Sequence, residues 1–306
     1  MIKKIKNKIK NFLGNNKLNI DNEEIKISLG KILTNINSNK KPNSIEEIEF
    51  KIFSQFGDDG IIQFIINKLK LEDQYKNFIE FGVDDYLESN TRFLLFNNNW
   101  SGLIMDSSKD NIRKIKESYY YWKFDLEAVC AFIKKENINN LISNSKIGKK
   151  IGLLSIDIDG NDYWIWEEIN NIDPIIVIVE FNSNFGFNEK ITIPYKENFE
   201  RNKAHYSNLY WGSSLEALKF LAQKKDYKFV CTNTSGNNAY FVKSSKFDDL
   251  GLNLKNNFFK SKFRESRDKV GRKNFLSGSE KIDEIMECKV VCVETKKEAK
   301  LKEFIK

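Results

Sequence analysis

Short apolar runs alternate along this chain with segments in which apolar residues recur every three or four positions. Four runs are almost free of polar residues, which is typical of strands buried on both faces of a parallel sheet. Each run has an acidic residue at or near its carboxyl end: 78–81 with Glu80, 102–106 with Asp106, 151–158 with Asp157, and 175–181 with Glu180. Because the carboxyl ends of parallel strands meet at one sheet edge, these acids predict the floor of a ligand crevice.

The segments around these runs have the spacing of helices with one buried face. They cover residues 59–70, 90–97, 109–118, 127–137, 164–169 and 214–224, and a short third strand is expected at 122–125. The last two strands, 228–232 and 239–242, are joined by a turn-rich segment, which predicts a hairpin and one antiparallel strand. The alternation predicts an α/β fold with a Rossmann-like, seven-stranded, mostly parallel sheet and helices on both faces.

The pattern divides the chain into three parts. Residues 1–50 are expected to hold a basic helix and a polar connector with a second helix around 25–36. Residues 51–250 hold the regular alternation, and residues 251–306 form a basic extension without a readable motif. Residues 2–13 place isoleucines on one helical stripe with lysines opposite, which suits either an anionic membrane surface or a solvated helix packed on its own protein. The chain has no run of about 18 apolar residues, so no membrane span is predicted.

The net charge of +7 is unevenly distributed. Residues 1–17 contain six lysines and no acid, and residues 251–306 hold 15 Lys/Arg against nine Asp/Glu. The centre is therefore slightly acidic, which argues against a nucleic-acid partner, since phosphate binding needs a basic face. The four cysteines lack zinc-like spacing, and no secretory signal is evident. A cytoplasmic protein is expected, with residues 1–13 as a candidate contact with the inner membrane surface.

The loop after the first strand, Glu80-Phe81-Gly82-Val83-Asp84-Asp85, favours a cationic ligand. Gly82 permits close approach of the backbone, but the second and third glycines of the dinucleotide fingerprint are absent. An acidic loop also disfavours a pyrophosphate and suits a sulfonium cofactor such as S-adenosylmethionine. Asp106, after the second strand, is placed to accept ribose hydroxyls or to cap a helix. Asp125 would lie at the level of adenine, or cap the following helix.

Several blocks occur in the order found in one methyltransferase group. They are residues 53–60 (FSQFGDDG), 78–83 (FIEFGV), 99–103 (NWSGL), 154–163 (LSIDIDGNDY), 179–182 (VEFN) and 210–215 (YWGSSL). Over residues 50–245 the chain resembles the FkbM-like class I S-adenosylmethionine-dependent methyltransferases. The resemblance implies methyl transfer to a sugar or small metabolite. It also implies cofactor contacts from Glu80, Gly82, Asp106 and Asp125, and from Gln55 and Asn90 at the methionine end.

Asp157 and Asp159 alternate in the expected strand, so their side chains would emerge on the same side. One carboxylate could take the proton of an acceptor hydroxyl as a general base. Alternatively Asp157, with Glu180 and Asn182, could hold Mg or Mn, or the segment could be a turn with a helix cap. His205 is the only histidine, and it is either a further candidate base or a surface residue.

Two other functions fit parts of the pattern. Asp157-Ile158-Asp159 has the form of the metal-nucleotide DxD motif of a glycosyltransferase. The basic ends suit a non-enzymatic module that binds membrane surfaces. The methyltransferase prediction implies a small-molecule or saccharide acceptor. Neither the identity of that acceptor nor the oligomeric state can be inferred from the sequence.

Overall fold

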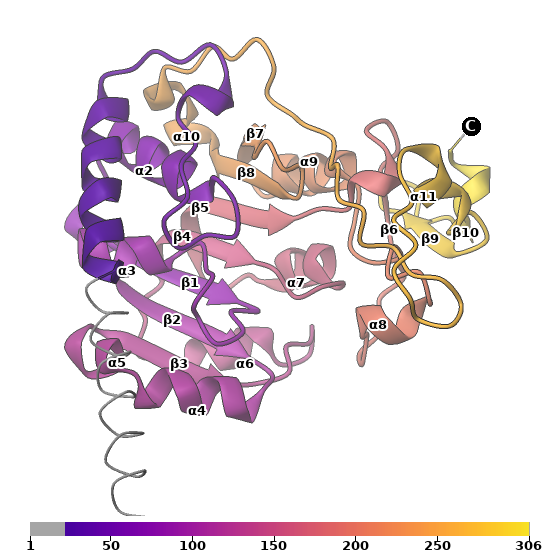
Figure 1. The fold of residues 1–306 in the computed structure, drawn as a ribbon, viewed down its shortest axis with the longest axis horizontal. Helices are drawn as coiled ribbons and strands as arrows, with labels where there is room; N and C mark the ends of the chain where they lie inside the picture. The colour runs from indigo at the N-terminus through magenta and orange to yellow at the C-terminus, as the bar shows by residue number, and fades with distance from the viewer. Residues whose placement is uncertain (1–21, 306) are drawn as a thin grey trace, which may run out of the picture.

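The computed structural model describes residues 22–305 of the chain, so the helix predicted at residues 2–13 lies outside the described part. A large central sheet lies between two layers of helices, and a small sheet stands to one side of it (Figure 1). Residues 22–38 form a helix, which confirms the one expected around 25–36. Between residues 22 and 305, no helix is both long and apolar enough to cross a membrane.

The central sheet has seven strands in the order β3-β2-β1-β4-β5-β8-β7. β1 to β5 run parallel, whereas β8 is antiparallel to both β5 and β7. The predicted hairpin and the predicted Rossmann-like arrangement of class I methyltransferases are therefore confirmed. The strands are β1 (Asn77–Phe81), β2 (Ser101–Asp106), β3 (Leu126–Cys130), β4 (Lys150–Ile156), β5 (Asp173–Glu180), β7 (Tyr227–Thr232) and β8 (Asn238–Lys243).

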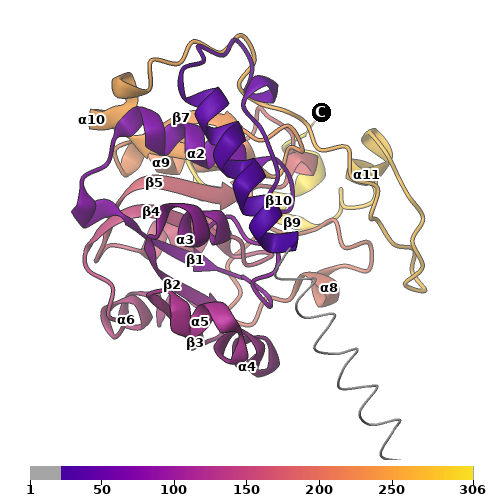
Figure 2. The same cartoon turned by 60° about the vertical axis from the view of Figure 1, so that its left-hand side comes forward.

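Side chains of alternate strand residues enter two hydrophobic cores, one on each sheet face. Phe78 of β1 belongs to the core that also contains residues of helices α2 to α5, whereas Ile79 belongs to the core that contains residues of α6, α7 and α9. Figure 2 shows the helices on the two faces of the sheet. Both residues are fully buried, which explains why the β1 run lacks polar alternation. The helices are α2 (Asp58–Leu69), α3 (Arg92–Asn98), α4 (Lys109–Glu117), α5 (Tyr119–Lys123), α6 (Ile138–Ser143), α7 (Asp162–Glu168), α8 (Arg201–Ala204), α9 (Leu215–Lys224), α10 (Ser244–Phe247) and α11 (Ser279–Asp283).

The third strand lies later in the chain than predicted. Residues 119–123 form the short helix α5, and the strand is β3, where a helix was expected. Leu126 and Ala128 are buried while Glu127 and Val129 are half-buried, as in a strand at the sheet edge. The aromatic residues that precede β3 led to the prediction of a strand at 122–125. In the structure, the Trp122 side chain is largely exposed on α5.

The C-terminal extension folds back onto the body and supplies most of a second, smaller sheet. This sheet has the order β10-β9-β6, from β6 (Ile191–Thr192), β9 (Lys289–Cys292) and β10 (Glu298–Lys300). Its core contains Phe185, Ile193 and Leu209 from the body together with Val290 and Leu301 from the extension. The two-residue β6 had no readable signal in the sequence.

The start of α2 is held by two buried acids in the FSQFGDDG block. One carboxylate oxygen of Asp59 accepts the backbone N–H groups of residues 52–54 at 2.7–2.8 Å and the Ser54 hydroxyl. Burial raises the pKa of Asp59 to about 6 despite these donors. Asp58 accepts the side-chain amides of Asn233 and Asn238, which ties α2 to the β7–β8 hairpin. The block therefore joins the first helix of the sheet domain to the hairpin that forms its last two strands.

We expect Asp59→Ala to lower the free energy of unfolding by about 3 kcal/mol, because three buried backbone N–H groups lose their acceptor. Urea denaturation followed by circular dichroism measures this change. Asp73→Ala is the matched control, since the Asp73 side chain is 95% exposed and makes only a surface ion pair with Lys76. Its expected cost is much smaller, because an exposed ion pair contributes little to stability. Equal costs for the two variants would contradict the role assigned to Asp59.

Candidate active site

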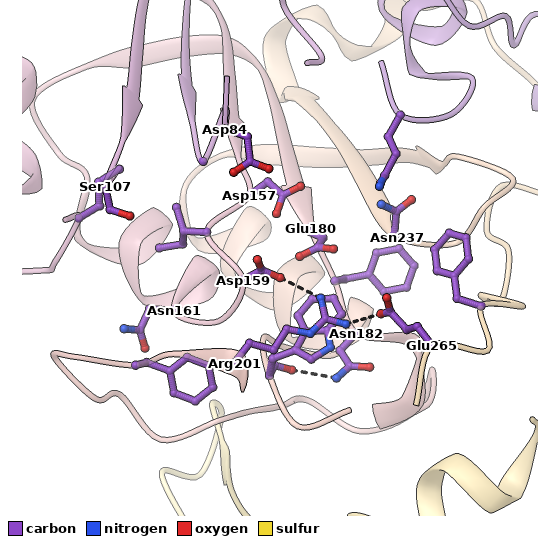
Figure 3. Close-up of a pocket in the computed structure, with 18 of the residues that line it drawn as sticks. Asp84, Ser107, Asp157, Asp159, Asn161, Glu180, Asn182, Arg201, Asn237 and Glu265 are labelled. Atoms are coloured by element: carbon purple, nitrogen blue, oxygen red, sulfur yellow. Dashed lines mark hydrogen bonds and ion pairs between the residues drawn. The ribbon is translucent and has the colours of Figure 1, made fainter. Parts of the chain in front are cut away.

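A cavity of about 560 Å³ lies at the carboxyl ends of β1, β2, β4 and β5. Its opposite wall comes from the segment around α8, the β7–β8 turn and the C-terminal extension (Figure 3). The volume lies within the range of about 300–1,000 Å³ common for small-molecule sites. Six carboxylates and two cationic side chains line it: Asp84, Asp106, Asp157, Asp159, Glu180 and Glu265, with Arg201 and Lys281. Of the four acids predicted at this sheet edge, Asp106, Asp157 and Glu180 line the cavity.

The backbone at Gly82 forms the closest crossing in the floor of the cavity. Gly82 has φ +72°, and its N–H donates to the Met105 carbonyl at 2.9 Å. A Cβ atom at this position would lie 1.6 Å from the backbone oxygen of Asp157. Only glycine fits both the conformation and the space. The ends of β1, β2 and β4 meet here, so Gly82 sets the spacing between Asp106 and Asp157.

Glu80 lies beneath the cavity and not in its lining. Its carboxylate accepts the Ser89 and Thr91 hydroxyls and the backbone N–H groups of Asn90 and Thr91, which start helix α3. The Asn90 side chain in turn donates to the Ser155 hydroxyl at 3.1 Å. Glu80 and Asn90 were both predicted as cofactor contacts, but the structure places them where they hold the loop after β1.

Asp106 lies at the cavity edge, as predicted, at the end of β2. One carboxylate oxygen accepts the Asp84 N–H at 3.1 Å, and the other accepts the Ser108 N–H at 2.7 Å and the Asn111 side-chain amide at 3.4 Å. A carboxylate offers about four acceptor positions, so about one remains for a ligand. Burial, followed by the charge of Asp106, raises the pKa of the neighbouring Asp84. This corner of the cavity therefore favours a cation or several hydroxyl donors.

The position predicted for Asp125 is wrong. Its carbonyl accepts the Gly102 N–H at the start of β2, so Asp125 precedes β3 and lies at the edge of the sheet opposite to Asp106. The residue level with Asp106 is Cys130, the last residue of β3. Residues 131–133, which follow β3, line the cavity in its place. The shifted third strand caused the error, because a strand placed four residues early assigns the wrong residue to its carboxyl end.

Asp157 and Glu180 form a pair of carboxyl groups in the cavity wall. They lie beside each other at the ends of β4 and β5 (Figure 3). Burial raises the pKa of both groups well above the ordinary range; the charge of Asp159 raises that of Asp157 further, and the charge of Asp157 raises that of Glu180 further. Two neighbouring buried carboxylates do not both ionise readily, so the pair is expected to share one proton.

Asp159 does not continue the strand, which corrects the predicted alternation. β4 ends at Ile156, and Asp159 has φ +56° in a turn whose N–H groups at Ile158 and Gly160 donate to Asp162. Asp162 thus has the turn-forming role that was weighed for this segment. Asp159 still lines the cavity, but its exposed carboxylate pairs with an arginine. The DxD form of a glycosyltransferase therefore lacks a free second carboxylate.

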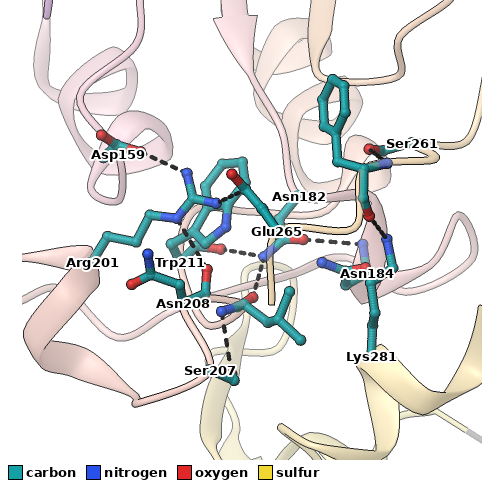
Figure 4. A network of polar contacts seen from close by, with 12 residues as sticks. Asp159, Asn182, Asn184, Arg201, Ser207, Asn208, Trp211, Ser261, Glu265 and Lys281 are labelled. Atoms are coloured by element: carbon teal, nitrogen blue, oxygen red, sulfur yellow. Dashed lines mark hydrogen bonds and ion pairs between the residues drawn. The ribbon is translucent and has the colours of Figure 1, made fainter. Parts of the chain in front are cut away.

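That arginine is Arg201 of α8, which sequence reasoning missed. Its guanidinium pairs with Asp159 at 2.8 Å and with Glu265 of the C-terminal extension, and it lies 4.4 Å above the Trp211 ring (Figure 4). Arg201 also carries a favourable charge interaction with Glu180. A lone arginine in a polar, loop-like segment gave no signal, because its partners come from distant parts of the chain.

The residues present do not fit the divalent cation predicted at Asp157, Glu180 and Asn182. The Asn182 amide donates to the Leu209 and Trp211 carbonyls at 2.8 and 2.9 Å, and its oxygen accepts the Asn184 N–H. No three His, Cys, Asp or Glu side chains within residues 22–305 are grouped to hold a metal. Arg201 already brings a positive charge to the carboxylates, so the metal assignment is withdrawn.

The two remaining predicted residues lie in different surroundings. Gln55 lines the cavity, in the loop before α2. His205 does not; its Nδ1 atom bonds the Ser207 hydroxyl at 2.7 Å, and its ring lies against Tyr206. Burial lowers the pKa of His205, so its ring is mostly neutral near pH 7. The structure gives His205 no route to a ligand in this cavity.

Comparisons with known proteins find similarity to solved structures but not to any sequence family. No protein-family model matches this chain, and no curated protein matches it in sequence. Similar solved structures include S-adenosylmethionine-dependent methyltransferases from Clostridium acetobutylicum (11% identity, TM-score 0.37, covering 61% of this chain and 90% of that one) and Aquifex aeolicus (6%, 0.33, 58% and 85%). Another is an O-methyltransferase from Bacillus cereus in complex with SAH (13%, 0.39, 72% and 91%). These identities are too low to transfer an activity.

Proposed function

We propose that this protein transfers a methyl group from S-adenosylmethionine to a hydroxyl of a polar, saccharide-like small molecule, as an FkbM-like methyltransferase would. The observation that carries the proposal is the cavity at the carboxyl ends of β1, β2 and β4. There, Gly82 brings the backbone close and Asp84, Asp106 and Asp157 surround the space with negative charge. Such a rim favours a ligand with cationic groups and disfavours one with phosphates.

The lining residues fit this cofactor from one end to the other. Asp106 can accept a ribose hydroxyl, as an acid about 20 residues after the first strand's glycine does in related folds. Ala131 and Ile133, after β3, give an apolar surface for a flat base. Asp84 and Asp157 offer carboxylates to the ammonium and sulfonium charges, and Gln55 offers an amide to the methionine end. When bound, S-adenosylmethionine supplies an electrophilic methyl group to an attacking oxygen.

The acceptor half of the cavity would position a hydroxyl and remove its proton. Asp157 is the proposed base, because it lines the cavity at the end of β4 and has in Glu180 a neighbouring carboxyl with which it shares a proton. In this scheme the shared proton is on Glu180, which leaves Asp157 as the carboxylate. Glu180 then acts as a hydrogen-bond donor that orients Asp157. The protein's main contribution would be to hold the two reactants in line at short distance.

The same half of the cavity suits a polyol. The rings of Phe199, Trp211 and Phe263 line it together with the amides of Asn184 and Asn237. Aromatic faces pack against the C–H faces of sugar rings, while amides and carboxylates bond their hydroxyls. Two of these five residues come from the segment around α8, and Phe263 comes from the extension. We infer that residues 51–250 form the catalytic unit and that residues 251–306 complete its acceptor wall.

Binding of S-adenosylhomocysteine tests the proposal most directly. We expect isothermal titration calorimetry to give a micromolar dissociation constant for the wild type. Asp106→Ala should weaken binding about 30- to 100-fold, because a hydrogen bond to a charged acceptor is lost. Asp125→Ala is the matched control, since Asp125 is exposed at the opposite sheet edge, and it should bind as the wild type does. Absence of binding by the wild type, or equal losses in both variants, would remove the basis of the proposal.

A further inference from the structure

The acceptor wall contains a buried ammonium without a counter-charge. Lys281, on α11 of the C-terminal extension, is 5% exposed and lines the cavity. Its Nζ atom donates to the Phe263 carbonyl at 3.0 Å, its one hydrogen bond to the described residues. An ammonium has three N–H donors, so two are left for another partner. Buried charges in proteins are normally paired, which makes this one an exception to explain.

The other cation of the cavity shows the contrast. Arg201 is paired with Asp159 and Glu265, whereas no carboxylate of residues 22–305 lies within 4.0 Å of Lys281. Glu265 attracts Lys281 only from a distance, and Lys260 repels it. Burial is the largest effect on Lys281 and lowers its pKa, as expected for an ammonium that lacks a close counter-ion.

The surroundings of Lys281 are those of an anion site. Asn184 and Ser261 line the same part of the cavity, beside the Lys281 side chain (Figure 4). The Ser261 oxygen accepts the Phe263 N–H, so its own O–H remains available as a donor. The Asn184 side-chain amide has no partner among residues 22–305. Lys281, Asn184 and Ser261 therefore supply three donor groups to this part of the cavity, and no carboxylate of residues 22–305 lies within 4.0 Å of the ammonium.

We propose that Lys281, with Asn184 and Ser261, binds a carboxylate or phosphate group of the acceptor, so that the acceptor is an anionic saccharide or polyol. The statement that the bound anion is the methyl acceptor rests on the proposed function. The anion site itself does not depend on that function. An anionic group would supply the missing counter-charge and fix the distance between its own position and the hydroxyl at Asp157. Neutral analogues would lose this ion pair in a desolvated site.

Inorganic phosphate and acetate are the probes, because they separate the two anion chemistries. Each is titrated by calorimetry or ligand-observed NMR into protein saturated with S-adenosylhomocysteine, so that the cofactor's own carboxylate site is filled. We expect at least one ion to bind with a millimolar dissociation constant. Lys281→Met should weaken that binding more than tenfold, and Lys281→Arg should retain it. Lys260→Met, which changes a nearby lysine outside the cavity lining, should bind as the wild type does.

Three results would overturn the inference. The first is that neither ion binds, and the second is that Lys281→Met binds the ion as tightly as the wild type. The third is that the ion competes with S-adenosylhomocysteine, which would assign Lys281 to the cofactor's carboxylate. Thermal melts of the variants show whether they are folded. If S-adenosylhomocysteine itself does not bind while phosphate binding still depends on Lys281, the methyltransferase proposal fails and the anion site remains.

Discussion

Replacing Gly82 by alanine is expected to lower the free energy of unfolding by about 4 kcal/mol or more and to abolish binding of S-adenosylhomocysteine. A methyl group there would overlap the Asp157 backbone oxygen at 1.6 Å, and φ +72° is unfavourable for any L side chain. Relief requires β1 and β4 to separate at their carboxyl ends. Losses of this size are exceptional for single substitutions. The loss is large here because the added methyl group would collide with the backbone of the neighbouring strand end.

Gly251→Ala separates the two contributions. Gly251 also has positive φ, +57°, but a Cβ atom there would meet nothing within 4 Å. It should therefore cost only about 1–2 kcal/mol, the penalty of the left-handed conformation, and leave the cofactor site unchanged. Urea denaturation and calorimetry on both variants measure the difference. If Gly82→Ala were no less stable than Gly251→Ala, the close crossing of β1 and β4 would not exist as described.

The sheet was predictable from the sequence because burial on both faces leaves a strong signal. Runs such as 175–179 contain no polar residue, so both their secondary structure and their order followed from alternation with helices. The prediction of the third strand was wrong because this strand lies at the sheet edge, where Glu127 and Val129 are only half-buried. A half-exposed strand resembles one face of a helix over five residues, and that ambiguity moved Asp125 to the wrong edge.

The cavity floor was predictable for the same reason, whereas its opposite wall was not. Asp106 and Asp157 follow buried strands, so their placement followed from the parallel sheet. Arg201 and Lys281 come from a four-residue and a five-residue helix whose positions depend on contacts across the fold. Pairing of Arg201 with Asp159 and Glu265 joins residues 42 and 64 positions apart. Local patterns do not record such distances.

Glu80 shows a different kind of limit. The sequence correctly placed a buried acid next to Gly82, but the acid's partners decided its role. Ser89, Asn90 and Thr91 donate four hydrogen bonds to the Glu80 carboxylate. The carboxylate therefore has no acceptor position left for a ligand. Residue type and strand position thus identify candidates for ligand contact. Only the count of hydrogen bonds tells a ligand-binding acid from a loop-holding one.

Asp157→Asn is expected to reduce kcat by about 10²–10⁴ with any acceptor that the wild type methylates, because it removes the proposed base. Its affinity for S-adenosylhomocysteine should change much less. In the wild type, the pKa of Asp157 lies well above the ordinary carboxyl value, and the reaction needs the deprotonated form. Activity should therefore fall as the pH is lowered through this raised pKa, well before ordinary carboxylates are protonated.

Glu180→Gln is the companion variant that tests the direction of the shared proton. An amide can still donate a hydrogen bond to Asp157, so kcat should fall about tenfold or less if the proton of the pair resides on Glu180. Initial rates of both variants from pH 5 to 9 give kcat and its acidic limb. A larger loss in Glu180→Gln than in Asp157→Asn would reverse the two roles. Equal kcat in Asp157→Asn and wild type would exclude Asp157 as the base, because an amide cannot accept the hydroxyl proton.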